Sequence, residues 1–282
     1  NGQTVRALYR TENNIAKTRS LFAHYNRLPL FEHIEWVQGD IINIPSLEDA
    51  FDGISLVYHC AAYISFEPKD EELLRKVNIE GTANMVNLSL AYGVSKFCHV
   101  SSIAALGDAR QNEVITEETE WNPEVRHNDY ALSKYGAEIE VWRAWQEGLN
   151  VVIVNPGLIF GYGFWNCGTG LTFKEVKKGQ SFYTKGTCGV VAVEDVVRPM
   201  VQLMNTGASG ERFILVAKNL AFKDMLNAIA DGMKKKRPSI YATPYMTSFA
   251  WRADWLLSKL LIRKRIFTRS MARSSHNVEQ YD

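Results

Sequence analysis

Short runs of β-branched and apolar residues alternate with amphipathic helical stretches along the first 156 residues of the chain. Strands buried on both faces have nearly continuous apolar runs, and strands that alternate with helices form parallel sheets covered on both sides. The alternation therefore predicts an α/β fold with a doubly wound parallel sheet. The expected strands are 4–9, 34–37, 56–60, 96–101 and 151–155, and the expected helices include 73–90 and 130–145.

The pattern changes after Pro156. A glycine-rich stretch follows, and then come short strands and aromatic-rich helices up to Ile262. This change predicts two domains. Residues 1–156 would form the sheet domain, and residues 157–282 would form mostly a smaller C-terminal substrate-binding lobe, with some segments returning to the sheet.

Composition excludes several classes of protein. The net charge is only +1, with 46% hydrophobic and 22% charged residues, which indicates a folded globular protein without a nucleic-acid partner. The four cysteines stand far apart without CxxC pairs, so we expect reduced thiols and no metal site. No apolar run reaches the ~20 residues of a membrane span, and the polar start lacks a signal-peptide core. These features predict a cytoplasmic protein.

Tyr130 and Lys134 are four residues apart on a predicted helix, so their side chains lie over the same face. A tyrosine with an ordinary pKa is a poor acid–base catalyst at neutral pH, unless a nearby cation favours its phenolate. Lys134 would supply that cation. The alternative is a chance pair on a solvated helix, since the spacing alone is common.

Ser101 and Ser102 follow the mostly apolar run 97–100. The position places two hydroxyls just past the carboxyl end of a strand, where open α/β sheets bind ligands. A serine that only starts a loop or caps a helix is the alternative.

Five motifs, in their order and separations, together resemble the extended short-chain dehydrogenase/reductases, which form the NAD-dependent epimerase/dehydratase family. Within that family they are most similar to the 3β-hydroxysteroid dehydrogenase and dihydroflavonol reductase branch. The resemblance implies a Rossmann-like fold whose sheet domain binds NAD or NADP. The motifs are HCAA at 59–62, NIEGT at 78–82, VSS at 100–102, YALSK at 130–134 and NPGLIFGYG at 155–163.

The resemblance also implies roles for individual residues. Tyr130 would be the general acid/base, and Lys134 would lower its pKa and hold the nicotinamide ribose. Ser102 would orient the substrate oxygen, with Ser101 as the alternative if the register differs by one. The implied cofactor contacts are Asp40 and Ile41 at the adenine, the backbone of Ala61 and Ala62 along the cofactor, and Pro156, Gly157 and Leu158 at the nicotinamide carboxamide.

The GxxGxxG loop of that family is absent from this sequence. Its glycines let the backbone approach the pyrophosphate, and the helix after it offers N–H groups to the anion. The loop and its strand would open the sheet domain. We therefore expect the gene product to begin about 25 residues earlier, roughly the length of a βα unit.

The cofactor prediction favours NADP slightly over NAD. Arg10 follows the first expected strand, where an arginine would pair with the 2′-phosphate of NADP and an acidic residue would bind the ribose hydroxyls of NAD. Glu12 is close enough to reverse the preference, and a solvated Arg10 is the remaining alternative.

A basic segment lies near the C-terminus. Residues 262–273 mix five basic residues with apolar ones, which is compatible with contact to an anionic membrane surface or with a segment that simply caps the fold. We favour capping. The basic residues are Arg263, Lys264, Arg265, Arg269 and Arg273.

The leading functional hypothesis is an enzyme that transfers hydride between NAD(P) and a carbonyl or secondary alcohol of a small, fairly apolar substrate. A nucleotide-sugar epimerase or dehydratase is the second hypothesis. A cofactor-binding regulator without turnover is the third, which the intact Ser102, Tyr130 and Lys134 argue against. The sequence leaves open whether the protein forms a homodimer. The expected apolar substrate wall is Phe160, Phe164, Trp165, Phe182 and Tyr183, and the cations that would favour a diphosphate if they converged are Lys174, Lys177, Lys178 and Lys185.

Overall fold

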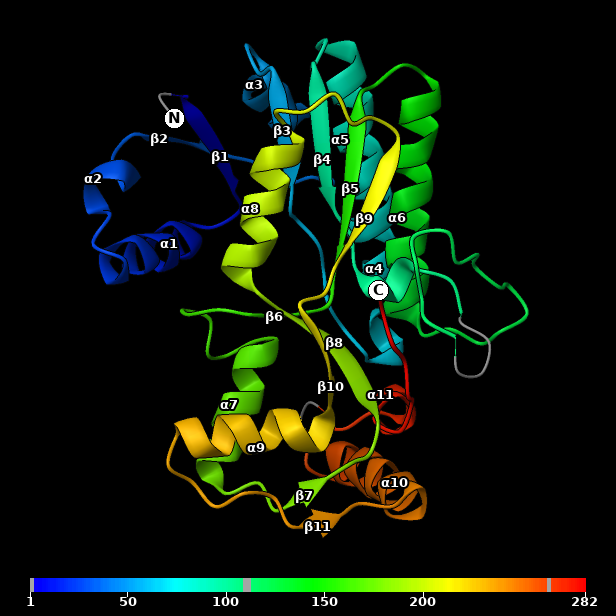
Figure 1. Ribbon diagram of the computed structural model, residues 1–282. Helices are drawn as coiled ribbons and strands as arrows, with labels where there is room; N and C mark the ends of the chain where they lie inside the picture. The colour runs from blue at the N-terminus through cyan, green and yellow to red at the C-terminus, as the bar shows by residue number, and fades with distance from the viewer. Residues whose placement is uncertain (1–2, 109–112, 263–264) are drawn as a thin grey trace.

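A four-stranded parallel sheet forms the centre of the computed structural model, which describes residues 3–108, 113–262 and 265–282 (Figure 1). Its strand order is β3-β4-β5-β9. All six residues of β5 are buried, as the continuous apolar run predicted. The strands are β3 (Leu56–His59), β4 (Lys96–Val100), β5 (Val151–Pro156) and β9 (Glu211–Leu215).

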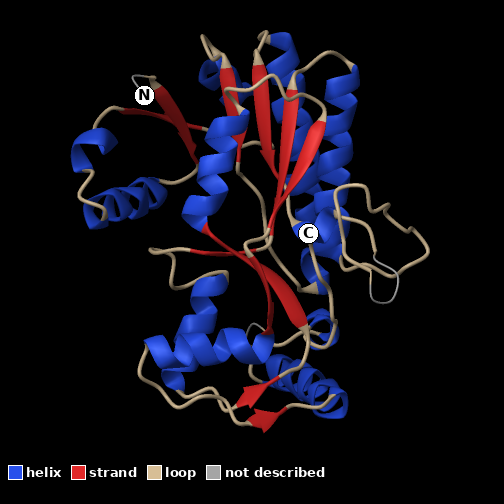
Figure 2. Ribbon diagram, in the orientation of Figure 1, coloured by secondary structure: helices blue, strands red, loops and turns tan. Residues whose placement is uncertain are grey.

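The side chains of β5 alternate between two helical layers. Val151 and Ile153 pack with α5 and α6 on one face, whereas Val152 and Val154 pack with α8 on the other. Figure 2 shows the helices on both sides of the sheet, so the predicted doubly wound α/β architecture is confirmed. The covering helices are α5 (Gly81–Ala91), α6 (Asp129–Gln146) and α8 (Val193–Leu203).

The first two strands form a separate two-stranded parallel sheet, in which β1 pairs with β2. No hydrogen bond of the described ladders joins β1 to β3, so the parallel strands lie in two sheets rather than in the single one expected. The elements of this part are β1 (Val5–Tyr9), α1 (Glu12–His24), α2 (Leu28–Phe31) and β2 (Ile34–Gln38). The next helix, α3 (Pro45–Phe51), packs into the core beside β5, and α4 (Glu71–Leu74) follows β3.

The lobe after β5 is built on a second, three-stranded sheet of order β10-β8-β6. Its core joins Val176 of α7 to Met225 and Ile229 of α9. β9 lies between β8 and β10 in the chain yet pairs with β5, so the chain passes from the lobe to the central sheet and back again between β8 and β10. A domain boundary at Pro156 stays a prediction. The elements are β6 (Leu158–Phe160), α7 (Thr169–Lys178), β7 (Phe182–Tyr183), β8 (Thr187–Ala192), β10 (Lys218–Ala221), α9 (Phe222–Gly232), β11 (Ile240–Tyr241), α10 (Pro244–Leu260) and α11 (Arg269–Ser274).

The last residues of the chain return to the centre of the molecule. Tyr281 is buried against Leu106 and Ile115, and its backbone carbonyl accepts a hydrogen bond from Asn219. Among the described residues, no helix is both long enough and apolar enough to cross a membrane.

Candidate active site

The site lies where β3 and β4 end and α6 begins. Asn128 caps α6 by accepting a hydrogen bond from the Ala131 N–H at 2.9 Å. This cap fixes Tyr130 in the first turn of the helix. The buried Asn78 joins the segment after β3 to the same helix, because it donates to the Tyr63 carbonyl and to the Ser133 hydroxyl.

Tyr130 lies near Ser102, the serine that the family resemblance assigns to the same site. The Ser102 hydroxyl lowers the pKa of the Tyr130 phenol, while burial, the larger effect, raises that pKa above its ordinary value. The Phe66 ring stands edge-on at 5.7 Å from the Tyr130 ring. The net result is a phenol that keeps its proton at neutral pH.

Lys134 is only 2% exposed, and its ammonium donates to the Val100 carbonyl at 2.9 Å. Burial lowers the pKa of Lys134 to about 8, and the charges of Glu138 and Cys60 oppose the change. Lys134 therefore lies at the end of β4 with a proton that it loses far more easily than an ordinary lysine. The predicted lowering of the Tyr130 pKa by Lys134 stays a prediction.

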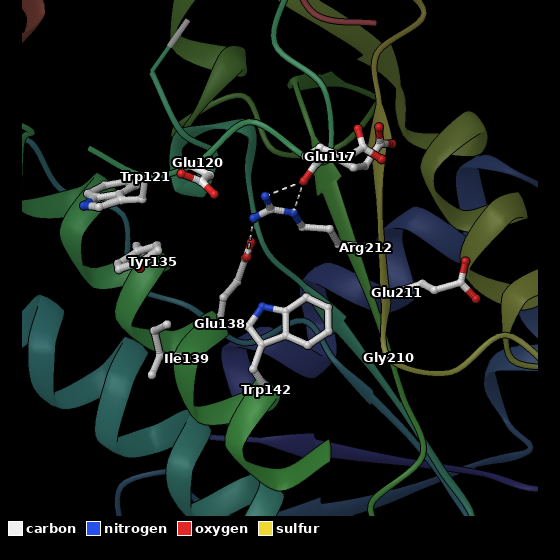
Figure 3. Close-up of a pocket in the computed structure, with 11 residues that line it drawn as sticks. Glu117, Glu120, Trp121, Tyr135, Glu138, Ile139, Trp142, Gly210, Glu211 and Arg212 are labelled. Atoms are coloured by element: carbon white, nitrogen blue, oxygen red, sulfur yellow. Dashed lines mark hydrogen bonds and ion pairs between the residues drawn. The ribbon is translucent and has the colours of Figure 1, made fainter. Parts of the chain in front are cut away.

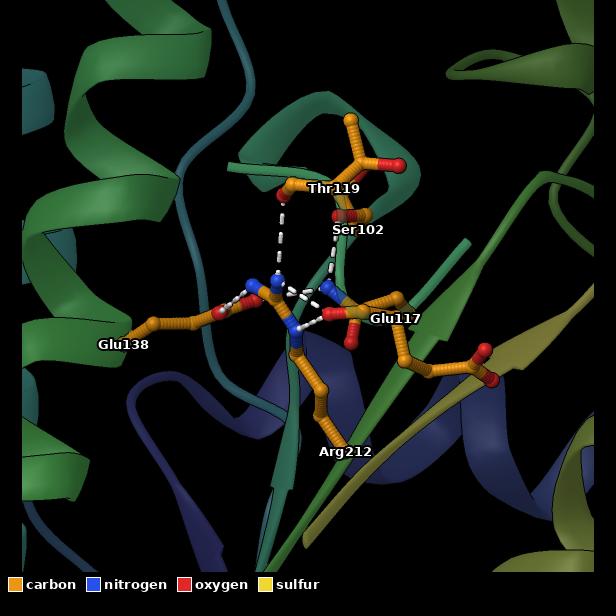
Figure 4. A network of polar contacts seen from close by, with 6 residues as sticks. Ser102, Glu117, Thr119, Glu138 and Arg212 are labelled. Carbon is orange, nitrogen blue, oxygen red and sulfur yellow. Dashed lines mark hydrogen bonds and ion pairs between the residues drawn. The ribbon is translucent and has the colours of Figure 1, made fainter. Parts of the chain in front are cut away.

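Glu138 follows Lys134 by one more helical turn and is 1% exposed. The Asn155 amide donates to its Oε1 atom at 2.6 Å and also to the Ser102 carbonyl at 2.9 Å. On the other side, the Arg212 guanidinium lies 3.4 Å from its Oε2 atom. Figure 4 shows these contacts linking α6, the end of β4 and β9.

Arg212 extends the network to the segment that contains Glu117 and Thr119. Its guanidinium donates to the backbone carbonyls of Glu117 and Thr119, and the Glu117 side chain accepts a hydrogen bond from the Ile214 N–H. A hollow of about 650 Å³ lies beside this network, on the side of α6 away from β4 (Figure 3). It is lined by Glu117, Glu118, Glu120, Trp121, Tyr135, Glu138, Ile139, Trp142, Gly210, Glu211 and Arg212.

The sequence analysis missed the Glu138 network. The spacing Tyr130, Lys134, Glu138 repeats every four residues on one helix, so the pattern would have placed Glu138 on the same face. Nothing in the sequence pairs Glu138 with Arg212, because that contact joins residues 74 positions apart.

Two of the predicted adenosine contacts come together at the ends of β1 and β2. Arg10 Nη1 lies 3.9 Å from Asp40 Oδ2, on the molecular surface. A hollow of about 650 Å³ next to Asp40 is lined by Ile42 and Asn84, whereas the side chain of Ile41 is buried against Gly81. The Arg10–Asp40 pair and the open hollow fit the adenosine end of a dinucleotide.

The remaining predicted cofactor contacts lie at or just after the ends of β3 and β5. Ala61 and Ala62 are exposed just after β3, so their small side chains leave the backbone open to a flat ligand. Pro156 is buried, and the bare Cα of Gly157 packs on the Gly189 carbonyl, where a Cβ would come within 2.4 Å. Leu158 is exposed. These small and open positions fit a dinucleotide laid across the carboxyl ends of the strands.

Only part of the predicted aromatic wall comes together. Phe160 and Trp165 both stand edge-on to Phe173, at 6.0 and 5.8 Å between ring centroids, and Phe164 is exposed on the loop before α7. The other two members, Phe182 and Tyr183, form β7, which lies with β11 at the end of the lobe farthest from β4 and β5 (Figure 1).

The fold and the site define a Rossmann-like α/β enzyme with a Ser, a Tyr and a Lys at the carboxyl ends of its strands. The chain belongs to the NAD dependent epimerase/dehydratase family, whose model matches residues 1–216. This finding confirms the predicted family, the enzyme class of NAD(P)-dependent oxidoreductases and epimerases/dehydratases, and the dinucleotide cofactor class.

Two curated relatives and one solved structure illustrate the likeness. Sterol demethylase protein B of Methylococcus capsulatus is 27% identical over 98% of this chain and 80% of its own length. A putative dihydroflavonol 4-reductase of Synechocystis sp. is 27% identical over 80% of this chain and 68% of its own length. The crystal structure of gox2253 has a TM-score of 0.80 at 25% identity, covering all of this chain and 83% of that one.

Proposed function

We propose that the protein transfers hydride to or from a carbonyl or secondary alcohol of a small, fairly apolar substrate, with Ser102, Tyr130 and Lys134 as its catalytic residues. The observation that carries the proposal is the placement of the Tyr130 phenol near the Ser102 hydroxyl just after β4, where the buried Lys134 ammonium donates to the Val100 carbonyl. A proton donor and a second hydroxyl at one point suit a reacting oxygen atom.

Each residue has a distinct task in this proposal. Tyr130 gives its proton to the substrate oxygen during reduction and takes it back during oxidation, and the burial that raises its pKa keeps that proton available. The Ser102 hydroxyl orients the same oxygen. Lys134 places a positive charge one helical turn from the phenol and favours its phenolate when the proton leaves.

The cofactor would lie across the strand ends, with Arg10 and Asp40 at the adenosine, Ala61 and Ala62 along its length, and Leu158 near the nicotinamide. When bound, it supplies or accepts the hydride. Lys134 would hold the nicotinamide ribose.

The lobe favours an apolar substrate over a nucleotide sugar, because its lysines do not converge. Lys178 pairs with Glu175 at 2.6 Å, and Lys185 lies over the Tyr241 ring in the distal sheet. Lys174 donates to the Asn166 side chain. A diphosphate needs converging cations, whereas an apolar molecule gains affinity from buried area. The relatives named for sterol demethylation and dihydroflavonol reduction point to the same substrate class.

A turnover screen tests the proposal. Full-length protein is incubated with NAD or NADP and with two substrate panels, hydrophobic ketones and secondary alcohols on one side and UDP- and GDP-sugars on the other. Nicotinamide absorbance and product chromatography follow the reaction, with Tyr130→Phe as the blank. We expect faster conversion of the apolar panel. Faster conversion of nucleotide sugars would instead establish an epimerase or dehydratase.

We predict that Arg10 makes the protein prefer NADP over NAD. Its guanidinium is 63% exposed at the edge of the predicted adenosine site, where it can form a bidentate contact with a 2′-phosphate. We expect Arg10→Ala to raise the Kd for NADPH at least tenfold, and to change the Kd for NADH less than threefold. Fluorescence titration of both cofactors measures this, with Arg19→Ala as a matched surface control. Equal affinity of the unmutated protein for both cofactors would contradict the preference for NADP.

We predict that kcat/KM falls on the alkaline side of its pH profile because Lys134 loses its proton there. Since the pKa of Lys134 is about 8, its ammonium is lost as pH rises through that value, and kcat/KM should fall there. The folded state then binds fewer protons than the unfolded state between about pH 8 and 10.5, so this group makes the protein more stable as pH rises. Titration of Lys134 therefore does not destabilise the protein in this range, and Tm measured over the same range separates the limb from unfolding caused by other groups.

Lys134→Arg is the control for that limb, because a guanidinium keeps its charge throughout the range. The variant should lose the limb near pH 8, whatever its absolute activity. A profile that is flat to pH 10 in the unmutated protein, or a limb that persists in Lys134→Arg, would remove Lys134 from the proposed machinery.

A further inference from the structure

Helix α10 has its polarity reversed relative to an ordinary surface helix. Its buried residues are polar: Thr247, Asp254 and Ser258 recur at steps of seven and four, which places them on one face. The Asp254 carboxylate accepts hydrogen bonds from the backbone N–H groups of Ile266 and Phe267 at 3.0 and 3.1 Å. The face that attaches α10 to the fold is therefore held by polar contacts.

The opposite face of α10 is apolar and exposed. Tyr245 is 89% exposed, Phe249 75%, Leu256 52% and Leu260 69%, and their steps of four, seven and four form one stripe along the helix. The exposed Ile262 continues this apolar surface past the end of α10. A contiguous surface of this kind on a folded protein marks an interaction site.

Positive charge accompanies this stripe. Residues 244–274 contain seven lysines and arginines but a single acidic residue, the buried Asp254, although the whole chain carries only +1. On the helical wheel Arg252 and Lys259 lie along one edge of the stripe, and each stands over a neighbouring tryptophan ring, Trp251 and Trp255, at 4.5 and 4.4 Å.

These cations are not neutralised within the part of the chain that the structure describes. Arg252, Lys259, Arg269 and Arg273 form no ion pair there. The pKa of Arg269 is lowered, first by Arg273 and then by burial and by other nearby arginines. Like charges held close together repel each other, and an anionic partner would remove that repulsion.

We propose that α10 lies on an anionic lipid surface, with the stripe of Tyr245, Phe249, Leu256 and Leu260 inserted among the acyl chains and with Arg252 and Lys259 among the headgroups. An exposed apolar face and a basic edge with tryptophans beside it form the amphipathic pattern of interfacial helices. A second copy of the chain would bring the same positive charges together, which argues against a dimer through this face. Nucleic acid would leave the apolar stripe in water. The proposal departs from the sequence analysis, which favoured capping over membrane contact for residues 262–273.

Vesicle flotation tests the proposal, with full-length protein and vesicles of pure phosphatidylcholine or of equal parts phosphatidylcholine and phosphatidylglycerol. We expect binding to the anionic vesicles at least tenfold stronger than to the neutral ones, and weakened by high salt. Phe249→Asp/Leu260→Asp should abolish binding, and Arg252→Gln/Lys259→Gln should reduce it at least threefold. The matched control is Leu30→Asp, an exposed leucine on α2 that should bind like the unmutated protein.

All substituted side chains are exposed and lie outside the catalytic group, so the variants should keep their Tm and their turnover of a water-soluble substrate. The proposal therefore stands or falls independently of the proposed function. It is overturned if the unmutated protein does not float with anionic vesicles, or if Phe249→Asp/Leu260→Asp floats unchanged. It is also overturned if sedimentation shows a dimer that the same double variant dissociates while vesicle binding is absent.

Discussion

Replacement of Tyr130 by phenylalanine should lower kcat at least a hundredfold. The substitution removes only the phenolic hydroxyl, which carries the proton that Tyr130 would give to the substrate oxygen. A positioned acid contributes about 10²–10⁴ in rate. The ring keeps its edge-on contact with Phe66, so packing and Tm should stay close to those of the unmutated protein. Steady-state kinetics with the substrate found by the turnover screen measure the loss.

Cofactor affinity separates this effect from a general disturbance. Tyr130→Phe should leave the Kd for the dinucleotide within about threefold, since Lys134 keeps its contact with the Val100 carbonyl. Tyr135→Phe is a matched control on the same helix: Tyr135 stacks on Trp121 beside the hollow of Figure 3, away from Ser102. A kcat for Tyr130→Phe within threefold of the unmutated value would show that Tyr130 is not the acid/base.

The sheet could be predicted from the sequence because its signal is local. Each expected strand of the sheet domain matches an observed one to within one residue at each end. The short β-branched and apolar runs give this signal, although only β4 and β5 are buried along nearly their whole length. The residue pattern placed Ser102 just past a strand, and only the family resemblance joined it to Tyr130 in one site. The α6 cap holds Tyr130 in the first turn of its helix.

Features that depend on which distant segment of the chain packs against an element could not be predicted in the same way. The stripe on α10 has the periodicity of an ordinary amphipathic helix, and the sequence does not say which face turns inward. Asp254 decides this, because its hydrogen bonds to the backbone of residues 266 and 267 hold the polar face against the fold. Those bonds close a loop whose geometry no local pattern encodes.

The Glu138–Arg212 pair is the second such feature, and its loss should have a large effect on stability. Glu138→Ala leaves the mostly buried Arg212 charge without its carboxylate and the Asn155 amide without an acceptor at 2.6 Å. Breaking a buried ion pair from one side costs about 3–5 kcal/mol. At roughly 2–4 °C per kcal/mol, Tm should fall by about 10 °C. Glu147→Ala, which removes an exposed partner of Arg143 on the same helix, should change the free energy of unfolding by no more than about 0.5 kcal/mol.

Glu138→Gln distinguishes positioning of the catalytic group from mere structural support. The amide can still accept from Asn155, so the variant should fold, but it loses the negative charge that raises the pKa of Lys134. With that charge removed, the ammonium is less favoured, and the alkaline limb of kcat/KM should move from about pH 8 to lower pH. A role confined to packing would lower Tm and leave the limb in place. A limb that stays at its original pH in a folded Glu138→Gln protein would therefore separate the network from catalysis, whereas a downward shift would make Glu138 the residue that keeps Lys134 charged at neutral pH.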